Sequence, residues 1–445
     1  PCPASESLAL APCRPCCGRG RGRIRDQLCM TTQVAAGGFH FLVLLENGDC
    51  YAWGANKYGQ VGDGSTVDQA KPVRVMRGVR YIAAGFNHSL AVLNDGELYT
   101  WGCNDSGQLG DGTRTHRLTP AVVMNGTEVL YEVLAVAGGK EHSVAVVRDA
   151  GRSRAHCWAW GANVSGLEAV ETPSQYTVCA ITGLSQLALR PVKVLEDVAA
   201  ISAGMTHTLA IRSNGDCSAW GRNTNGQLGD GSTVNRLTAV KVLEKVRSIS
   251  AGVDYSLAVT ETSEVFAWGS NKGGRLGDGS TIDRLLPVRV MGDVRTVSAG
   301  HCHALAVSED GECLGWGRNL HGCICSNGNP EVLRPISVLP RAKLCAAGGC
   351  HSLALDLDGN FLVWGRDWHG QLTALRAFDA AQASASFARG PTRRDFEALE
   401  DAQRAEVAGT AALPENAAAI GPGDPRAVAA LLDGGGSTLL LGGGG

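Results

Sequence analysis

The sequence predicts an all-β fold, a seven-bladed β-propeller of four-stranded blades, from three observations. A Trp-Gly pair recurs seven times, and four of the six steps between successive pairs are 48 residues long. Short apolar runs near each pair are joined by Asn-Gly or Asp-Gly, which favours β-hairpins. No helical pattern lies between the pairs, and seven such units favour a closed ring. The repeat tryptophans are Trp53, Trp101, Trp160, Trp220, Trp268, Trp316 and Trp364.

Each repeat begins with a Gly-x-x-His loop, followed by a short apolar run, a turn and the tryptophan strand. The loop histidines are His40, His88, His142, His207, His303 and His351. One histidine slot in six repeats indicates hydrogen bonds that hold blade to blade rather than six catalytic bases. The fifth copy has Tyr255 in this slot, which keeps a polar tip on a ring.

Two further elements complete each repeat. An Asn or Asp two residues after the Trp-Gly pair predicts a loop corner, because these residues tolerate left-handed turn geometry. A strand beginning Pro-Val follows, as at residues 72–75, and a proline at its start suits an outer edge strand. A last run, such as residues 80–84, leads into the next loop glycine. Each repeat therefore supplies four short strands.

The ends of the chain predict how the ring closes. The seventh copy lacks the Pro-Val strand, and residues 24–30 precede the first loop glycine at the spacing of that strand. We expect this N-terminal segment to complete the last blade, which pairs two loose ends. The propeller then spans residues 24–376. We expect low order in the leader, residues 1–23, and in the Ala/Gly-rich tail, residues 377–445, apart from short helices in the tail.

Charge and hydropathy exclude several function classes. The formal net charge is −3, so the chain lacks the basic footprint of a dedicated nucleic-acid binder. No apolar run approaches the length that spans a bilayer, and we expect no membrane partner. The chain begins at Pro1 rather than Met, so a signal peptide cannot be assessed.

The sixteen cysteines raise the question of a metal site. The residue three before each tryptophan is Cys50, Leu98, Cys157, Cys217, Val265, Cys313 or Phe361, which indicates an apolar core slot. A denser group in copies six and seven comprises His301, Cys302, His303, His321, Cys323, Cys325, Cys345, Cys350 and His351. Its spacing is unlike a zinc finger, and two of its histidines already occupy repeat slots. The Gly-Asp-Gly turns lack the alternating acids of calcium loops. We expect no metal and no cofactor.

The repeat resembles that of the regulator of chromosome condensation (RCC) family. Ala-Gly-x-x-His-Ser-Leu-Ala-Val, then Asp-Gly, Tyr-x-Trp-Gly-x-Asn and Gly-Gln-Leu-Gly carry the resemblance, which residues 88–110 show nearly complete. It covers residues 34–376 in seven copies and implies the propeller fold. The kelch propeller, the alternative, has a paired-glycine strand end that is missing here. The family includes an exchange factor for the GTPase Ran, plant ultraviolet-B receptors, modules of giant ubiquitin ligases and bacterial inhibitors, so fold alone does not assign function.

The resemblance also implies where to look for a partner site. Plant photoreception depends on tryptophans directly after the loop glycine, and this chain has none there. In the exchange factor, acids in the loops of neighbouring blades and a wedge after the third Trp-Gly contact the GTPase. The matching acids are Glu141 and Asp254, in copies three and five, and residues 164–189 form an insertion at the wedge position. The candidate partner-binding residues are Lys140, Glu141, Asp254, Glu168, Glu171 and Tyr176.

A second expansion lies beside the insertion, at residues 125–131 and 150–156. We expect the two expansions to meet across one blade junction and form the partner-binding sector, because long loops in compact repeats mark binding faces.

The sequence favours a non-catalytic, monomeric protein-interaction propeller that acts as a regulatory scaffold. The alternatives are a guanine-nucleotide exchange factor for a Ran-like small GTPase, and a substrate-recognition module of a larger ubiquitin ligase. An extracellular inhibitor is disfavoured, because thiols in an oxidising compartment tend to pair. We therefore expect an intracellular location, in the cytoplasm, the nucleus or both.

Overall fold

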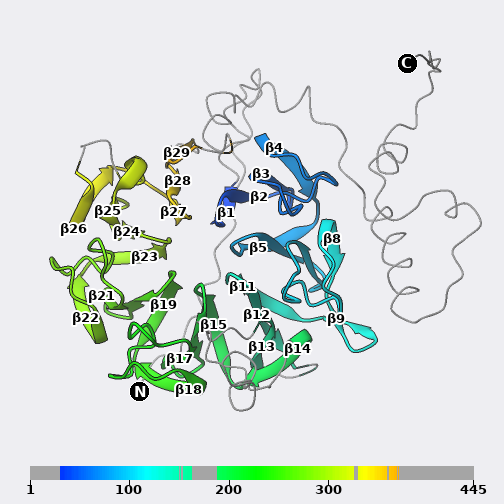
Figure 1. The fold of residues 1–445 in the computed structure, drawn as a ribbon, viewed down its shortest axis with the longest axis horizontal. Coiled ribbons are helices and arrows are strands. Elements are labelled where there is room, and N and C mark those ends of the chain that lie inside the picture. Colours follow the sequence, from blue (N-terminus) through cyan, green and yellow to red (C-terminus); the bar gives the residue numbers. More distant parts are fainter. Residues whose placement is uncertain are drawn as a thin grey trace, which may run out of the picture.

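The computed structural model describes residues 31–149, 151, 154–162, 188–324, 329–357, 360–367 and 369. It confirms the seven-bladed propeller: antiparallel sheets stand around a central channel like spokes (Figure 1). In each blade the innermost strand leads to the loop glycine, the second begins at the histidine slot and the third carries the tryptophan. No helix in the described part of the chain is long and apolar enough to cross a bilayer.

The strands follow the repeat closely. Blade 1 has β1 (Thr31–Ala36), β2 (His40–Leu45), β3 (Cys50–Gly54) and β4 (Gln69–Met76); blade 2 has β5 (Val79–Ala84), β6 (His88–Leu93), β7 (Leu98–Gly102) and β8 (Arg117–Val122). A hairpin of β9 (Met124–Asn125) and β10 (Glu128–Val129) leads to blade 3, with β11 (Val133–Gly138), β12 (His142–Arg148), β13 (Ala155–Gly161) and β14 (Ala188–Leu195).

The second half of the ring repeats this order. Blade 4 has β15 (Val198–Ala203), β16 (His207–Arg212), β17 (Cys217–Gly221) and β18 (Arg236–Leu243); blade 5 has β19 (Val246–Ala251), β20 (Tyr255–Thr260), β21 (Val265–Gly269) and β22 (Arg284–Met291). Blade 6 has β23 (Val294–Ala299), β24 (His303–Ser308), β25 (Cys313–Arg318), a 3₁₀ turn η3 (Leu320–Gly322) and β26 (Glu331–Leu339); blade 7 has β27 (Leu344–Ala347), β28 (His351–Leu355) and β29 (Phe361–Gly365).

Blade 7 therefore shows three strands among the described residues. The closing strand expected at residues 24–30 lies outside them, as do the leader and the tail. The described residues close the ring by packing, because β1 lies beside β27. Phe41 and Trp53 of blade 1 share one apolar cluster with Leu353 of blade 7.

The tryptophans fill the space between blades, which is why one is needed in each repeat. Trp101 packs with core residues of blade 1, and its Nε1 donates a hydrogen bond to the carbonyl of Gln60 in that blade, at 3.0 Å. Trp160, Trp268 and Trp316 donate to the equivalent carbonyls of the blades before them, at 2.9–3.0 Å. Trp364 is partly exposed, whereas the other six are at most 2% exposed.

Sterics explain the glycine that follows each tryptophan. Gly54 has a φ of +108°, and a Cβ there would lie 2.5 Å from the carbonyl oxygen of Phe39. The equivalent glycines of the other blades have φ values between +97° and +108° and meet the same obstacle. Because side-chain-bearing residues rarely adopt this conformation, the Trp-Gly pair is a backbone requirement.

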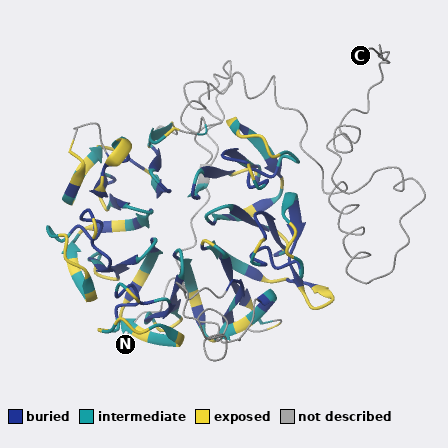
Figure 2. Cartoon of the chain, viewed as in Figure 1, coloured by how far each residue is buried: buried dark blue, intermediate teal, exposed yellow. Residues whose placement is uncertain are grey.

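The two faces of the ring are built from different connections. Successive strands of a blade are antiparallel, so the connections alternate between the two ends of the blade. The Gly-x-x-His loops lie on one face, which we call the loop face: residues 37–40, 85–88, 139–142, 204–207, 252–255, 300–303 and 348–351. Buried residues fill the blade interiors, and exposed ones concentrate on the outer strands and turns (Figure 2).

Candidate functional site

The loop histidines form a chain of hydrogen bonds from one blade to the next. His40 Nε2 lies 2.9 Å from Ser89 Oγ of blade 2, and that hydroxyl donates to the carbonyl of Gln60 at 2.7 Å. Since the single hydroxyl proton goes to the carbonyl, Oγ accepts from His40 Nε2–H. His88, His207 and His303 make the same contact with a serine of the following blade at 2.8–2.9 Å, and His142 meets Thr208 at 3.3 Å.

Two junctions depart from this pattern. Blade 6 has Ala304 where blades 2 to 5 and blade 7 have a hydroxyl, and there Tyr255 donates instead to the carbonyl of His303, at 2.7 Å. Blade 1 has Phe41 in the hydroxyl slot, and His351 meets its ring edge-on, with centroids 4.6 Å apart. The side chain in each slot therefore matches what the next blade offers.

Replacing Tyr255 tests this matching. Y255H is expected to lose about 1–3 kcal/mol of unfolding free energy, because the imidazole would face Ala304 without a partner. The double variant Y255H/A304S should regain most of that loss, since it recreates the histidine–serine pair of the other junctions. A urea-unfolding double-mutant cycle measures the coupling, and losses that simply add would contradict the pairing.

Burial keeps five of the loop histidines neutral. It lowers the pKa of His40 and His142 to about 4, and burial followed by neighbouring histidines lowers the pKa of His88, His207 and His351 to about 3. All five are at most 1% exposed. A neutral, buried imidazole that already binds its neighbour serves as a structural bond rather than as a general base for a substrate.

The Gly-Asp-Gly turns use their carboxylates within the fold. Asp63 accepts hydrogen bonds from Asn56 and Ser65, each at 2.9 Å. The matching residues Asp111, Asp230 and Asp278 also pair with arginines of their own blades at 2.6–2.8 Å. These oxygens hold the corner between the third and fourth strands, as turn chemistry requires.

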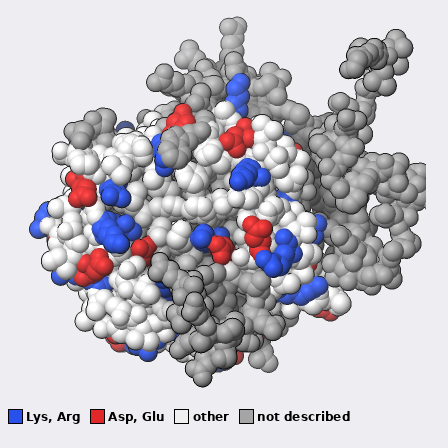
Figure 3. Space-filling view, in the orientation of Figure 1, with Lys and Arg blue, Asp and Glu red and all other residues white. Residues whose placement is uncertain are grey.

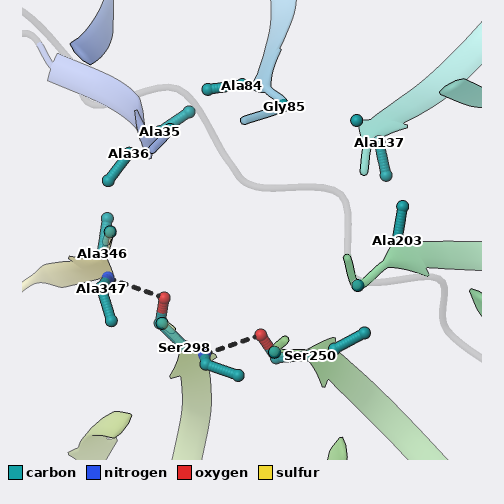
Figure 4. A pocket seen from close by; sticks show the side chains of 18 of the residues that line it. Ala35, Ala36, Ala84, Gly85, Ala137, Ala203, Ser250, Ser298, Ala346 and Ala347 are labelled. Atoms are coloured by element: carbon teal, nitrogen blue, oxygen red, sulfur yellow. Dashed lines mark hydrogen bonds between the residues drawn. The ribbon is translucent and has the colours of Figure 1, made fainter. Parts of the chain in front are cut away.

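The central channel encloses about 280 Å³ and is lined by the innermost strands. Small side chains such as Ala35 and Ala137 form most of its wall (Figure 4). Ser250 and Ser298 accept hydrogen bonds from the backbone N–H of the next blade at 2.9 Å, so each hydroxyl oxygen already has a partner within the fold. Lys140, His301 and Cys345 are its titratable lining residues. The described wall thus offers no carboxylate that could pair with a base.

An aromatic pair spans the mouth of the channel at the loop face. The rings of Phe86 and His301, from blades 2 and 6, stack with centroids 5.0 Å apart and planes inclined by 2°. Burial, followed by nearby His303 and Arg275, lowers the pKa of His301 to about 4, so the ring stays neutral. In the sequence, the two residues are visible only as different side chains directly after the loop glycine. No pattern in the sequence indicated a contact between two blades that are not neighbours in the ring.

The candidate partner residues fall into separate places. Exposed Lys140 and partly exposed Glu141 form an ion pair on blade 3, with Nζ and Oε1 3.0 Å apart. Asp254 lies two blades away, where Asn225 donates to it at 3.2 Å and the Arg275 guanidinium lies 3.8 Å from its other oxygen. Glu168, Glu171 and Tyr176 lie outside the described residues. The structure therefore does not bring the two loop acids together.

The two expansions leave the blades from opposite faces, and residues 163–187 of the insertion lie outside the described residues, so the expected meeting of the two expansions stays a prediction. The insertion connects β13 to β14 at the loop face, whereas residues 125–131 and the β12–β13 turn lie at the other end of the antiparallel strands. The β9–β10 hairpin packs against β14, the outer strand of blade 3, and Arg190 of that strand donates a hydrogen bond to the carbonyl of Gly126 in the hairpin.

Comparisons with known proteins agree with the repeat. The pattern of the "Regulator of chromosome condensation (RCC1) repeat" matches residues 47–92, 95–146, 214–259 and 263–307. A second pattern of the same name matches residues 32–60, 79–108, 198–227, 246–275 and 294–323. Together the two cover more than half of the chain.

Individual relatives are more distant. The chain is 27% identical to the ultraviolet-B receptor UVR8 of Arabidopsis thaliana over 207 residues, 46% of this chain and 44% of the receptor. It is 30% identical to the mouse ubiquitin ligase HERC2 over 209 residues, 45% of this chain and 4% of the ligase. Each match therefore spans less than half of the curated relative.

Solved structures show the same fold. Human WBSCR16 superimposes with a TM-score of 0.60 at 21% identity, over 74% of this chain and 87% of that chain. Yeast RCC1 (Prp20) bound to Kap60 gives 0.61 at 22% identity, over 78% of this chain and 84% of that chain. Repeat pattern, blade geometry and these likenesses agree, and the chain belongs to the regulator of chromosome condensation (RCC1) repeat family.

Proposed function

We propose that this propeller is a non-catalytic protein-binding platform, and that its partner binds the loop face at blade 3. One observation carries the location: the N–H of Ala162, at the start of the insertion, donates to the carbonyl of Glu141 at 2.6 Å. The long connection therefore begins beside the Lys140–Glu141 pair. A charged pair next to a long loop supplies both polar contacts and adaptable surface.

Charge and relatives both favour a protein as the partner. Acidic and basic side chains are interspersed on the face shown in Figure 3, without the broad basic surface that phosphate backbones require. Yeast RCC1 (Prp20) was crystallised with Kap60, and Prp20p is described as binding Gsp1p and histones. The HERC2 likeness is compatible with the same role inside a longer ligase.

A loop exchange tests the proposed face. Replacing residues 162–187 with residues 222–235, the shorter connection of blade 4, keeps the fold, because Arg222 makes the backbone bond to Thr206 that Ala162 makes to Glu141. Proteins captured from cell extract by the wild type are expected to be lost from this variant and from K140E/E141K. The reverse exchange in blade 4 is the matched control. Partners retained by both blade 3 variants would place the binding surface elsewhere.

Exchange activity on a Ran-like GTPase is the second candidate function. The insertion sits at the position of the exchange-factor wedge, which favours it, but Glu141 and Asp254 lie two blades apart and Asp254 is already engaged by Arg275. Release of labelled nucleotide from a Ran-type GTPase decides the matter. Acceleration by the wild type that the blade 3 loop exchange removes would establish exchange; an unchanged release rate at micromolar propeller leaves the platform role.

A further inference from the structure

The junction of blades 6 and 7 carries three cysteines in slots that hold other residues elsewhere. The residue directly before the loop histidine or tyrosine is Phe39, Asn87, Glu141, Thr206 and Asp254 in the first five copies, and Cys302 and Cys350 in the last two. A slot before the outer strand is Gln60, Gln108, Gln227 and Arg275 in other blades, and Cys323 in blade 6. Cysteine thus occupies two different repeat positions at this one junction, and the other copies have no cysteine at either position.

The fold brings these slots together. In blade 5 they hold Asp254 and Arg275, which form an ion pair at 3.8 Å. In blade 6 the sulfurs of Cys302 and Cys323 and one ring nitrogen of His303 all lie within 4.8 Å of one another. The sulfur of Cys350 lies 4.0 Å from that of Cys302. Four ligands at about 2.0–2.3 Å from a tetrahedral zinc are roughly 3.5–3.8 Å apart, so side-chain rotation would have to bring these atoms closer together around a bound ion.

His303 is suited to join the thiols. Ser352 gives its hydroxyl proton to the carbonyl of Cys323 at 2.7 Å, so its Oγ accepts from His303 Nε2–H at 2.8 Å. Nδ1 then carries a free lone pair, is buried, and has no hydrogen-bond partner. Several other loop histidines share this free nitrogen, so the thiols are what set this junction apart.

We propose that Cys302, Cys323, Cys350 and His303 bind one zinc ion, which clamps blade 6 to blade 7. Each bound thiol releases its proton to solvent, and the neutral imidazole binds without losing one. Three sulfurs and one nitrogen match the preference of zinc for structural Cys₃His sites. The spacing differs from a zinc finger because the ligands come from three separate loops, which the ring assembles. The sequence-based expectation of no metal did not include that assembly.

Metal titration of the reduced, full-length protein tests the site. After chelator treatment, zinc should bind at one equivalent per chain, and cobalt should give the visible bands of tetrahedral coordination with thiolate charge transfer. C323Q and C302T insert residues that other copies carry in these slots, and each should weaken zinc binding by at least about 100-fold. Zinc should also raise the Tm of the wild type, and neither variant should show that rise.

Two controls assign the signal. C217V changes a buried core cysteine to the valine found in that slot in blade 5 and should bind zinc as the wild type does. H116N breaks a second group of potential ligands among the described residues, Cys103, Asp105 and His116, and should also leave binding unchanged. The proposal fails if the wild type shows no saturable thiolate–cobalt absorption, if C302T and C323Q bind like the wild type, or if Cys302 and Cys350 form a disulfide under the reducing conditions used.

Discussion

Acidification from pH 7 to pH 4 is expected to unfold the propeller. Five loop histidines are buried and neutral, with pKa values of about 3 or 4 in the fold against about 6.5 for an exposed histidine. The unfolded chain therefore binds more protons than the folded one within this interval. Each histidine reduces the unfolding free energy by up to about 1.4 kcal/mol per pH unit. Five together give roughly 7 kcal/mol per unit, which within two units offsets a typical stability of about 5–15 kcal/mol.

The direction of this effect follows from the lowered pKa values. Well above pH 6.5 the unfolded chain also leaves its histidines neutral, so they do not lower the unfolding free energy. As the pH falls from 6.5 towards 4, the unfolded chain binds protons that the fold does not, and the unfolding free energy decreases. Urea-unfolding free energies measured between pH 7.5 and 5 should give this slope. H207Q keeps a donor to Ser256 but cannot titrate, so its slope should be smaller by about one proton. An unchanged slope in H207Q would show that other groups control acid unfolding.

Removing one interblade tryptophan is expected to produce the largest loss from a single substitution. Trp268 is fully buried, packs in the cluster shared by blades 4 and 5, and donates to the carbonyl of Gln227 at 2.9 Å. W268A should cost about 3–5 kcal/mol for the cavity, with a further contribution from the unsatisfied carbonyl.

Trp364 provides the matched control, because it occupies the same slot of blade 7 and is partly exposed. W364A should lower the unfolding free energy clearly less than W268A, since folding removes less of the apolar surface of Trp364 from water. Chemical denaturation of both variants beside the wild type measures the difference. Equal losses would mean that the tryptophan slot stabilises each blade internally, rather than through the junction with the blade before it.

The repeat made most of the scaffold predictable. Seven copies of one pattern average out the ambiguity of any single strand, so the four-strand unit and the blade-to-blade role of the histidine slot followed from residue identity and spacing. The reason for the glycine after each tryptophan was not visible, because it depends on the carbonyl of a loop residue such as Phe39. Such close approaches belong to the backbone and leave no trace in spacing.

The candidate site was less predictable, because its contacts join positions that differ between copies. The Phe86–His301 stack links blades 2 and 6, and only the diameter of the closed ring brings those residues together. His351 and Phe41 also lie far apart in the sequence, and they meet because ring closure places the last blade beside the first. The insertion of copy three, in contrast, was visible as a stretched step, and its site residues beyond residue 162 remain predictions.

The histidine contacts run in one direction around the ring, and this gives the blades an order. At four junctions, Nε2 of a histidine in one blade contacts the Oγ of a serine in the next blade. These four junctions are therefore chemically alike. The Tyr255–His303 and His351–Phe41 junctions use contacts that differ from this form and from each other. A transposed blade would leave a tyrosine or a phenylalanine against the wrong neighbour. These two junctions therefore distinguish blades 5, 6, 7 and 1 by their contacts, although their strands follow the same repeat.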